Sequence, residues 1–193
     1  MGREKKKEAS WQRTIEDRLK RLAEDPYDPF LQRVRDRLGR GEHTRAVKAL
    51  QTLVLGLPVL LGHIHRWTED PKAPIVISQW QAFLVKYLHE PADLVEEEDR
   101  NGLFSFVDDA YLAAAIYQRT LTLTLTRTFG RRRHIPTTTL SRATIRKGMG
   151  WAQRVLPRET ESLERWLNEV GEGKLDVVGW TMTKPSIRKK VTR

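Results

Sequence analysis

The most concentrated chemistry in the sequence is a cluster of basic side chains in its last third. Arginines at 131–133 are followed by hydroxyl side chains at 137–139 and by Ser141, and Arg142 and Arg146 are spaced to share one helical face. Basic groups interleaved with hydroxyls are the side chains that commonly contact phosphates. The residues predicted to bind nucleic acid are Arg127, Arg131, Arg132, Arg133, Arg142, Arg146, Lys147, Lys189 and Lys190.

The formal net charge of the 193-residue chain is +10, and it is distributed unevenly. Residues 1–67 have a net charge of +6, residues 68–117 of −7 and residues 118–193 of +11. A strongly basic segment favours a polyanionic partner, so we predict binding to nucleic acid or to a nucleic-acid-containing assembly. No helix-turn-helix, zinc-finger or RNA-binding sheet motif is recognisable, and sequence-specific recognition is not predicted.

Two other kinds of partner would also explain this distribution of charge. In one alternative the chain is an adaptor subunit of a multi-protein complex and its basic part binds an acidic protein partner. In the other it is a peripheral protein of an anionic membrane, which we do not favour. The most apolar stretch, residues 49–62, is shorter than the roughly 20 residues of a membrane span, so we interpret it as a buried core helix. The polar N-terminus lacks the apolar core of a signal peptide, and we expect a cytoplasmic bacterial protein.

Three carboxylates, Asp93, Asp108 and Asp109, are candidates for a divalent-cation site, because hard cations prefer oxygen ligands. The interpretation that we favour is structural. Asp93 caps a turn, and an Asp pair at the start of a helix satisfies free backbone N–H groups. We therefore predict no bound metal.

Catalytic motifs are not recognisable in the sequence. The chain has no Cys, which excludes a disulfide framework, a thiolate zinc site and a cysteine nucleophile. His63 and His65, two positions apart, point to different faces of a helix, and no HExxH pattern, P-loop or GxSxG motif is found. We expect a protein that is not an enzyme and that carries no cofactor.

The elements that must position these residues are helices. Apolar residues recur at helical spacing along most of the chain. Ser10 is the expected N-cap of the first helix, Asp28 and Pro29 begin the second, and Pro58 breaks or kinks the third. We predict an all-α, single-domain bundle with helices at about 10–25, 28–38, 43–67, 75–89, 107–118, 141–156 and 158–170.

Residues 120–129, TLTLTLTRTF, are ambiguous, because their strict alternation is typical of a strand. A strand here would pair with residues 175–182 as a minor two-stranded element. Continuation of the preceding helix is the slightly favoured alternative, since an isolated hairpin is weakly stable. The predicted organisation is a basic flexible N-terminus at 1–9, a helical domain at 10–182 and a basic tail at 183–193.

Residues 75–117 resemble the YkvA-like bacterial domain of unknown function. The family pattern is an apolar helix, a Pro-x-Asp-Leu-Ile/Val-Pro turn, and a second helix that begins after a Gly and an apolar segment with Asp-Asp. The matching positions are Pro91, Asp93, Leu94, Val95, Asp108 and Asp109. The second proline of the turn is missing, and residues 96–99 replace an apolar stretch. The resemblance implies a helical hairpin, with Pro91, Asp93, Asp108 and Asp109 as its structural residues, and no particular activity.

Overall fold

The computed structural model describes residues 2–39, 41–89, 94, 102–127 and 140–180, without the side chains of 2–12 and 125–127. All regular elements in these ranges are helices, which confirms the predicted all-α class. They are α1 (Gly2–Glu24), α2 (Phe30–Leu38), α3 (His43–Leu55), α4 (Leu57–Thr68), α5 (Ile75–His89), the short 3₁₀ helix η2 (Leu103–Phe106), α6 (Val107–Arg127), α7 (Arg142–Val155) and α8 (Pro157–Gly171).

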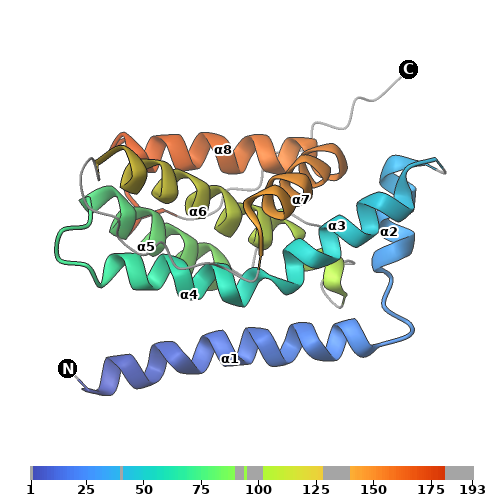
Figure 1. Ribbon diagram of the computed structural model, residues 1–193, viewed down its shortest axis with the longest axis horizontal. Coiled ribbons are helices and arrows are strands. Elements are labelled where there is room, and N and C mark those ends of the chain that lie inside the picture. Colours follow the sequence, from blue (N-terminus) through green and yellow to red (C-terminus); the bar gives the residue numbers. More distant parts are fainter. Residues whose placement is uncertain (1, 40, 90–93, 95–101, 128–139, 181–193) are drawn as a thin grey trace.

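Helix α6 is the centre of the bundle. It contacts α3, α4, α5, α7 and α8, and Figure 1 shows it between α8 and the α4–α5 side. Residues 110–117 are all buried. A helix that is apolar around its whole circumference needs such an enclosed position.

The C-terminal part of α6 resolves the ambiguity at residues 120–129. The helix continues to Arg127, so the favoured helical alternative is confirmed and the strand alternative is wrong for residues 120–127. Leu121 lies one turn after Tyr117 and is buried with it. The Thr122 hydroxyl donates to the Gln118 carbonyl at 3.0 Å, and the Thr124 hydroxyl donates to the Thr120 carbonyl at 3.0 Å. These two threonines thus satisfy their hydroxyls within the helix, which the alternating pattern does not reveal, whereas the buried Thr120 hydroxyl has no hydrogen-bond partner in the described part of the chain.

Pro58 lies in the first turn of α4, and the chain bends by 43° between α3 and α4, as predicted. Leu140 packs against the bend. A Cβ at Gly56 would lie 2.1 Å from the Leu140 Cδ1 atom, so a larger residue at this position would force the Leu140 side chain to move. Within the described ranges no single helix is long and apolar enough to cross a membrane, although the bent pair α3–α4 passes that test by length and composition.

Helix α1 differs from its prediction at one end. It ends at Glu24 as expected, but it begins at Gly2 rather than after Ser10. Residues 3–9 are almost entirely Arg, Lys, Glu and Ala, which have high helix propensity, so the helix extends through the predicted N-cap. Leu19 is the buried anchor of α1, which runs along one side of the bundle and contacts α3, α4 and η2 (Figure 1).

The start of α2 is tied to η2 by one carboxylate. The helix begins at Phe30 with Pro29 as its N-cap, so the prediction that Asp28 is the N-cap is wrong by one residue. The Asp28 Oδ1 atom accepts a hydrogen bond from the Phe30 N–H at 2.8 Å, two residues on, as in an Asx turn. Its Oδ2 atom accepts from the Leu103 N–H at 2.8 Å, across 75 residues of sequence.

Helices α5 and α6 pack against each other and form the predicted hairpin. Asp108 and Asp109 lie in the first turn of α6, as expected. Pro91 and Asp93 lie outside the described residues.

Candidate nucleic-acid interface

Helices α3 and α7 lie side by side and antiparallel. Leu140, just before α7, packs at Gly56 after α3, whereas Arg154 near the end of α7 pairs with Glu42 just before α3. The two helices are in close contact at Gly148, where a Cβ would lie 2.8 Å from the Leu53 Cβ atom. This close packing joins the outer faces of the two helices into one surface.

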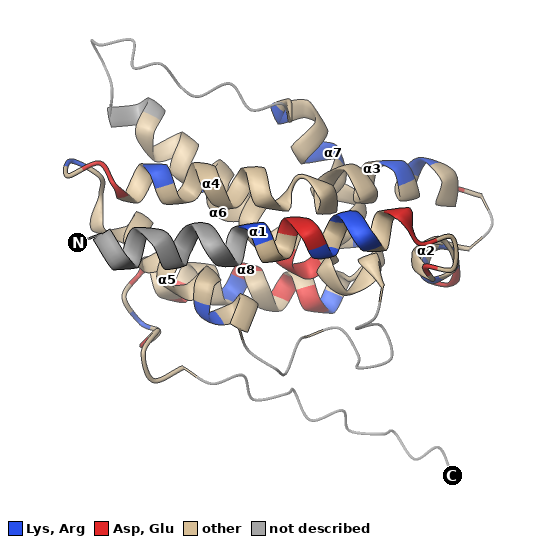
Figure 2. Cartoon of the chain, turned by 90° about the horizontal axis from the view of Figure 1, so that it is seen from below, with Lys and Arg blue, Asp and Glu red and all other residues tan. Residues whose placement is uncertain are grey.

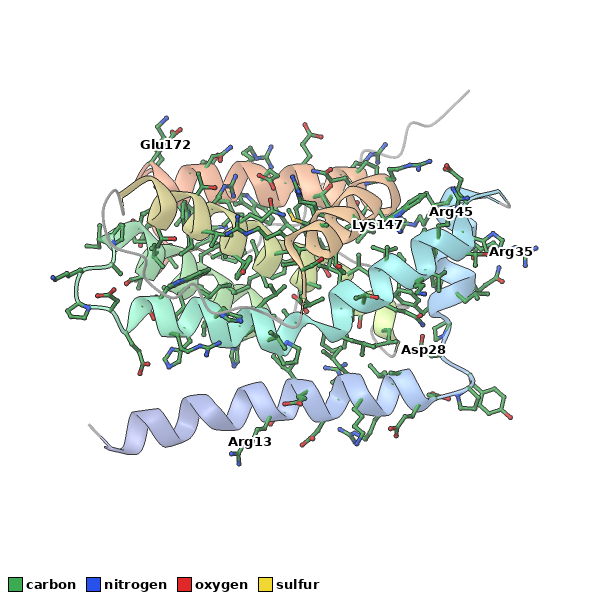
Figure 3. The ribbon with its side chains drawn as sticks, viewed as in Figure 1. Arg13, Asp28, Arg35, Arg45, Lys147 and Glu172 are labelled. Atoms are coloured by element: carbon green, nitrogen blue, oxygen red, sulfur yellow. The ribbon has the colours of Figure 1, made fainter. Side chains whose placement is uncertain are left out.

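This surface is strongly basic. Neither helix contains an Asp or Glu residue, and six of their basic side chains are exposed. One of them, Arg154, pairs with Glu42. The other five are Arg45, Lys48, Arg142, Arg146 and Lys147. We call these five residues the basic surface. None of them forms an ion pair with any residue in the described part of the chain. Figure 2 shows α3 and α7 with blue and no red segments, and Figure 3 shows Arg45 and Lys147 at the same end of the molecule.

The start of α7 is fixed by its cap. The Ser141 Oγ atom accepts a hydrogen bond from the Thr144 N–H at 3.1 Å, so the helix begins at Arg142. Arg142 and Arg146 then lie one turn apart on the side of α7 that faces α6.

A groove of about 210 Å³ lies between α6 and α7, next to the basic surface. Beneath it lie the core residues Tyr117, Leu121 and Ile145, whose exposed fractions of 3%, 5% and 0% leave little apolar surface accessible in the groove. Its rim is polar or charged. The residues that line it are Tyr117, Gln118, Leu121 and Thr122 from α6, and Arg142, Ile145 and Arg146 from α7.

The floor of this groove rests on a cluster of aromatic rings. The ring centroid of Tyr117 is 5.1 Å from that of Trp67 and 5.8 Å from that of His63. The Arg66 guanidinium lies 3.1 Å from the His63 Nδ1 atom, and donates to it when that nitrogen is unprotonated. Burial, and then the Arg66 charge, lower the pKa of His63 below its ordinary value. His63 therefore adds no positive charge beneath the groove at neutral pH.

The neighbouring helix α8 has the opposite character. It contains Glu159, Glu161, Glu164 and Glu169 against only two arginines. Glu164 is engaged on both oxygens, since it accepts from the Tyr111 hydroxyl at 2.8 Å and from the Arg119 guanidinium at 2.6 Å. Burial, and then the hydrogen bond to the Glu164 carboxylate, raise the pKa of the Tyr111 hydroxyl above its ordinary value. A second groove of about 220 Å³ opens here, but Glu161 and Glu164 line it and oppose an anionic ligand.

The structure brings together only part of the predicted set. Arg142, Arg146 and Lys147 lie on the basic surface. Arg127 ends α6, and its side chain is among those not described. The remaining predicted residues, Arg131, Arg132, Arg133, Lys189 and Lys190, lie outside the described residues.

Sequence reasoning missed Arg45 and Lys48, which belong to the first third of the chain. The available signal was that residues 43–55 form an amphipathic helix whose only formal charges are two cations on its polar side. That signal becomes informative only when α3 is known to contact α7.

The considered metal site lacks a geometric basis in the described ranges, where no three His, Asp or Glu side chains converge to hold an ion. Asp108 instead accepts a hydrogen bond from the Tyr87 hydroxyl at 2.6 Å. Asp93, the third candidate ligand, lies outside the described residues.

Comparison of the chain with family models, with curated proteins and with solved structures found no match. The resemblance of residues 75–117 to the YkvA-like domain stays a prediction.

Proposed function

We propose that the protein is a non-catalytic accessory protein that binds nucleic acid, or an assembly that contains nucleic acid, largely without sequence specificity. The observation that carries the proposal is the pairing of two acid-free helices, α3 and α7, with five exposed cations that have no ion-pair partner in the described ranges. The binding segment of the proposal is the basic C-terminal third, extended by Arg45 and Lys48 of α3.

The arrangement supports binding to a phosphate backbone for a physical reason. Each phosphate neutralised by a Lys or Arg releases condensed counterions, which is favourable at low salt and becomes less so as salt rises. Arginine also presents a planar fork of donors to phosphate oxygens. Cations already paired with carboxylates, such as Arg119 with Glu164, contribute much less, because a phosphate would have to displace the carboxylate.

The proposal is tested by a salt titration of binding to labelled duplex DNA, single-stranded DNA and structured RNA, between about 50 and 200 mM salt. The double variant Arg45→Gln/Lys48→Gln removes two cations from the basic surface. Its matched control, Lys20→Gln/Arg165→Gln, removes one Lys and one Arg from exposed positions on α1 and α8. We expect the first variant to lower the salt slope by about 2 and the control to leave it unchanged.

Two results would contradict the proposal. If the two double variants weakened binding equally, net charge rather than the basic surface would explain it. If the wild-type protein bound none of the three nucleic acids at 50 mM salt, the positive charge would serve an acidic protein partner, and the adaptor alternative would replace the proposal.

A further inference from the structure

One aromatic side chain lies among the cations of the basic surface. Trp151 is the one Trp, Tyr or Phe residue on α3 and α7. It follows Lys147 by one helical turn, so the two side chains share a face of α7. Trp151 packs against the edge of the core and is only partly buried, so part of its side chain is accessible at the surface.

The antiparallel packing of the two helices also brings Trp151 near the cations of α3. Gly148 packs against the middle of α3, and Arg154 pairs with Glu42, just before α3. Trp151 lies between these two positions on α7, so it is level with the first half of α3. That half carries both of the cations that α3 contributes to the basic surface.

The ring of Trp151 supports an arginine that remains accessible. The Arg154 guanidinium lies over the ring, with its central carbon 4.5 Å from the ring centroid. One edge of the guanidinium is paired with the Glu42 carboxylate. The Arg154 side chain is still 51% exposed, so the side of the guanidinium that faces away from the ring is open to solvent. The ring and the carboxylate together fix a planar cation at the surface.

The open side of a guanidinium favours a different group from its edge. Phosphates and carboxylates accept hydrogen bonds from the N–H groups at the edge, whereas planar aromatic systems stack on the face. Unpaired bases stack on aromatic side chains and on Arg guanidinium planes. The bases of a duplex are paired and stacked on one another and do not reach such a face. A planar ring on an anionic backbone therefore fits this place in the basic surface.

We infer that Trp151 and Arg154 form a stacking platform for one unpaired base of a single-stranded nucleic acid, whose phosphates contact Lys147 and the two cations of α3. The inference rests on the proposed function and adds to it a contact that only a single strand can make. Proteins that hold single strands commonly combine a basic track with aromatic side chains on which bases stack.

The first test compares two strands that differ only in their bases. The probes are a labelled thymidine strand of about 12 nucleotides and an abasic strand of the same length, each titrated with the wild-type protein at about 50 mM salt. We expect the thymidine strand to bind at least about fivefold more tightly, because one stacked base contributes about that much.

The variant Trp151→Leu removes the ring and keeps an apolar side chain at the edge of the core. It should bring the ratio of the two affinities close to one. The control is Trp180→Leu, because Trp180 is also partly exposed but packs against Phe83 of α5 and Trp166 of α8. This control should leave the ratio unchanged.

A second variant tests the platform without removing a core contact. Arg154→Lys keeps the positive charge at an exposed position, but an ammonium group has no planar face on which a base can stack. It should lower the ratio of the two affinities. Arg165→Lys makes the same substitution at an exposed position on α8 and should leave the ratio unchanged.

The outcomes separate the inference from the proposed function. Equal affinities of the wild-type protein for the two strands overturn the inference while the proposed function stands, because the abasic strand offers the same phosphates. A ratio that neither Trp151→Leu nor Arg154→Lys lowers also overturns the inference alone. Binding of neither strand at about 50 mM salt overturns both.

Discussion

The Tyr87 hydroxyl donates a 2.6 Å hydrogen bond to the Asp108 Oδ2 atom, and both residues are buried, with exposed fractions of 0% and 1%. The bond joins the end of α5 to the first turn of α6, across the two helices of the hairpin. It gives the buried carboxylate a structural role at the position where the sequence also suggested a cation ligand. The carboxylate also lies where the dipole of α6 favours negative charge.

Removal of this hydroxyl should destabilise the fold. We expect Tyr87→Phe to lower the free energy of unfolding by about 1.5–3 kcal/mol, because a buried carboxylate loses a charge-assisted hydrogen bond. The control is Tyr27→Phe, since Tyr27 is 90% exposed. Urea denaturation monitors both, and the midpoint should shift at constant m-value. An unchanged midpoint for Tyr87→Phe would show that the bond does not stabilise the hairpin.

The contact between α3 and α7 depends on a glycine that can be compared with another on the same helix. A Cβ at Gly148 would lie 2.8 Å from the Leu53 Cβ atom, whereas a Cβ at Gly150 meets nothing within 4 Å. We expect Gly148→Ala to destabilise the protein by about 1–3 kcal/mol through overpacking. Gly150→Ala should stabilise it by up to about 1 kcal/mol through helix propensity. Thermal or urea unfolding of both variants checks the opposite signs, and two changes of the same sign would contradict the packing at Gly148.

Much of this fold follows from local signals in the sequence. The helical spacing of apolar residues places α2 and α5 correctly, and Pro58 marks the bend between α3 and α4. One feature did not follow from local signals. The alternating Thr and Leu residues after Gln118 suit a strand by periodicity, and only the continuing core contacts of α6 make them helical.

The candidate site, too, could be predicted only in part from local signals in the sequence. The C-terminal arginines stand out by composition, so Arg142, Arg146 and Lys147 were found. Arg45 and Lys48 joined them only through the antiparallel packing of α3 on α7, a long-range contact that no local pattern specifies. The groove was likewise invisible, because the residues that line it belong to two helices whose packing no local pattern specifies.

Protonation of His63 should weaken the fold. Burial and the Arg66 charge lower its pKa in the folded protein, so below about pH 6.5 the unfolded chain binds a proton that the folded protein does not. Stability is then unaffected by His63 at higher pH and falls as the pH drops below about 6.5, with a slope of at most about 1.4 kcal/mol per pH unit. His63→Gln should remove this part of the pH dependence between pH 5.5 and 7.5. Urea midpoints measured across that range provide the test, and an unchanged slope in His63→Gln would contradict it.

Glu42 limits the basic surface at one end. It pairs with Arg154, whose guanidinium also lies 4.5 Å from the Trp151 ring centroid, and both partners of the pair are about half exposed. We expect Glu42→Gln to release Arg154 for phosphate contact and to remove one repulsive charge. The stability cost should be below about 1 kcal/mol, as for other exposed ion pairs.

If the proposed function holds, Glu42→Gln should strengthen binding to nucleic acid, by about two- to fivefold at low salt, and should steepen the salt slope by about 1. Glu161→Gln makes the same charge change on α8 and serves as the control, because Glu161 is exposed and forms no ion pair with Arg154. A salt titration of both variants with one labelled strand measures the effect. Equal gains in the two variants would mean that net charge alone sets the affinity, and a loss in Glu42→Gln would mean that the pair with Glu42 holds Arg154 in its binding position.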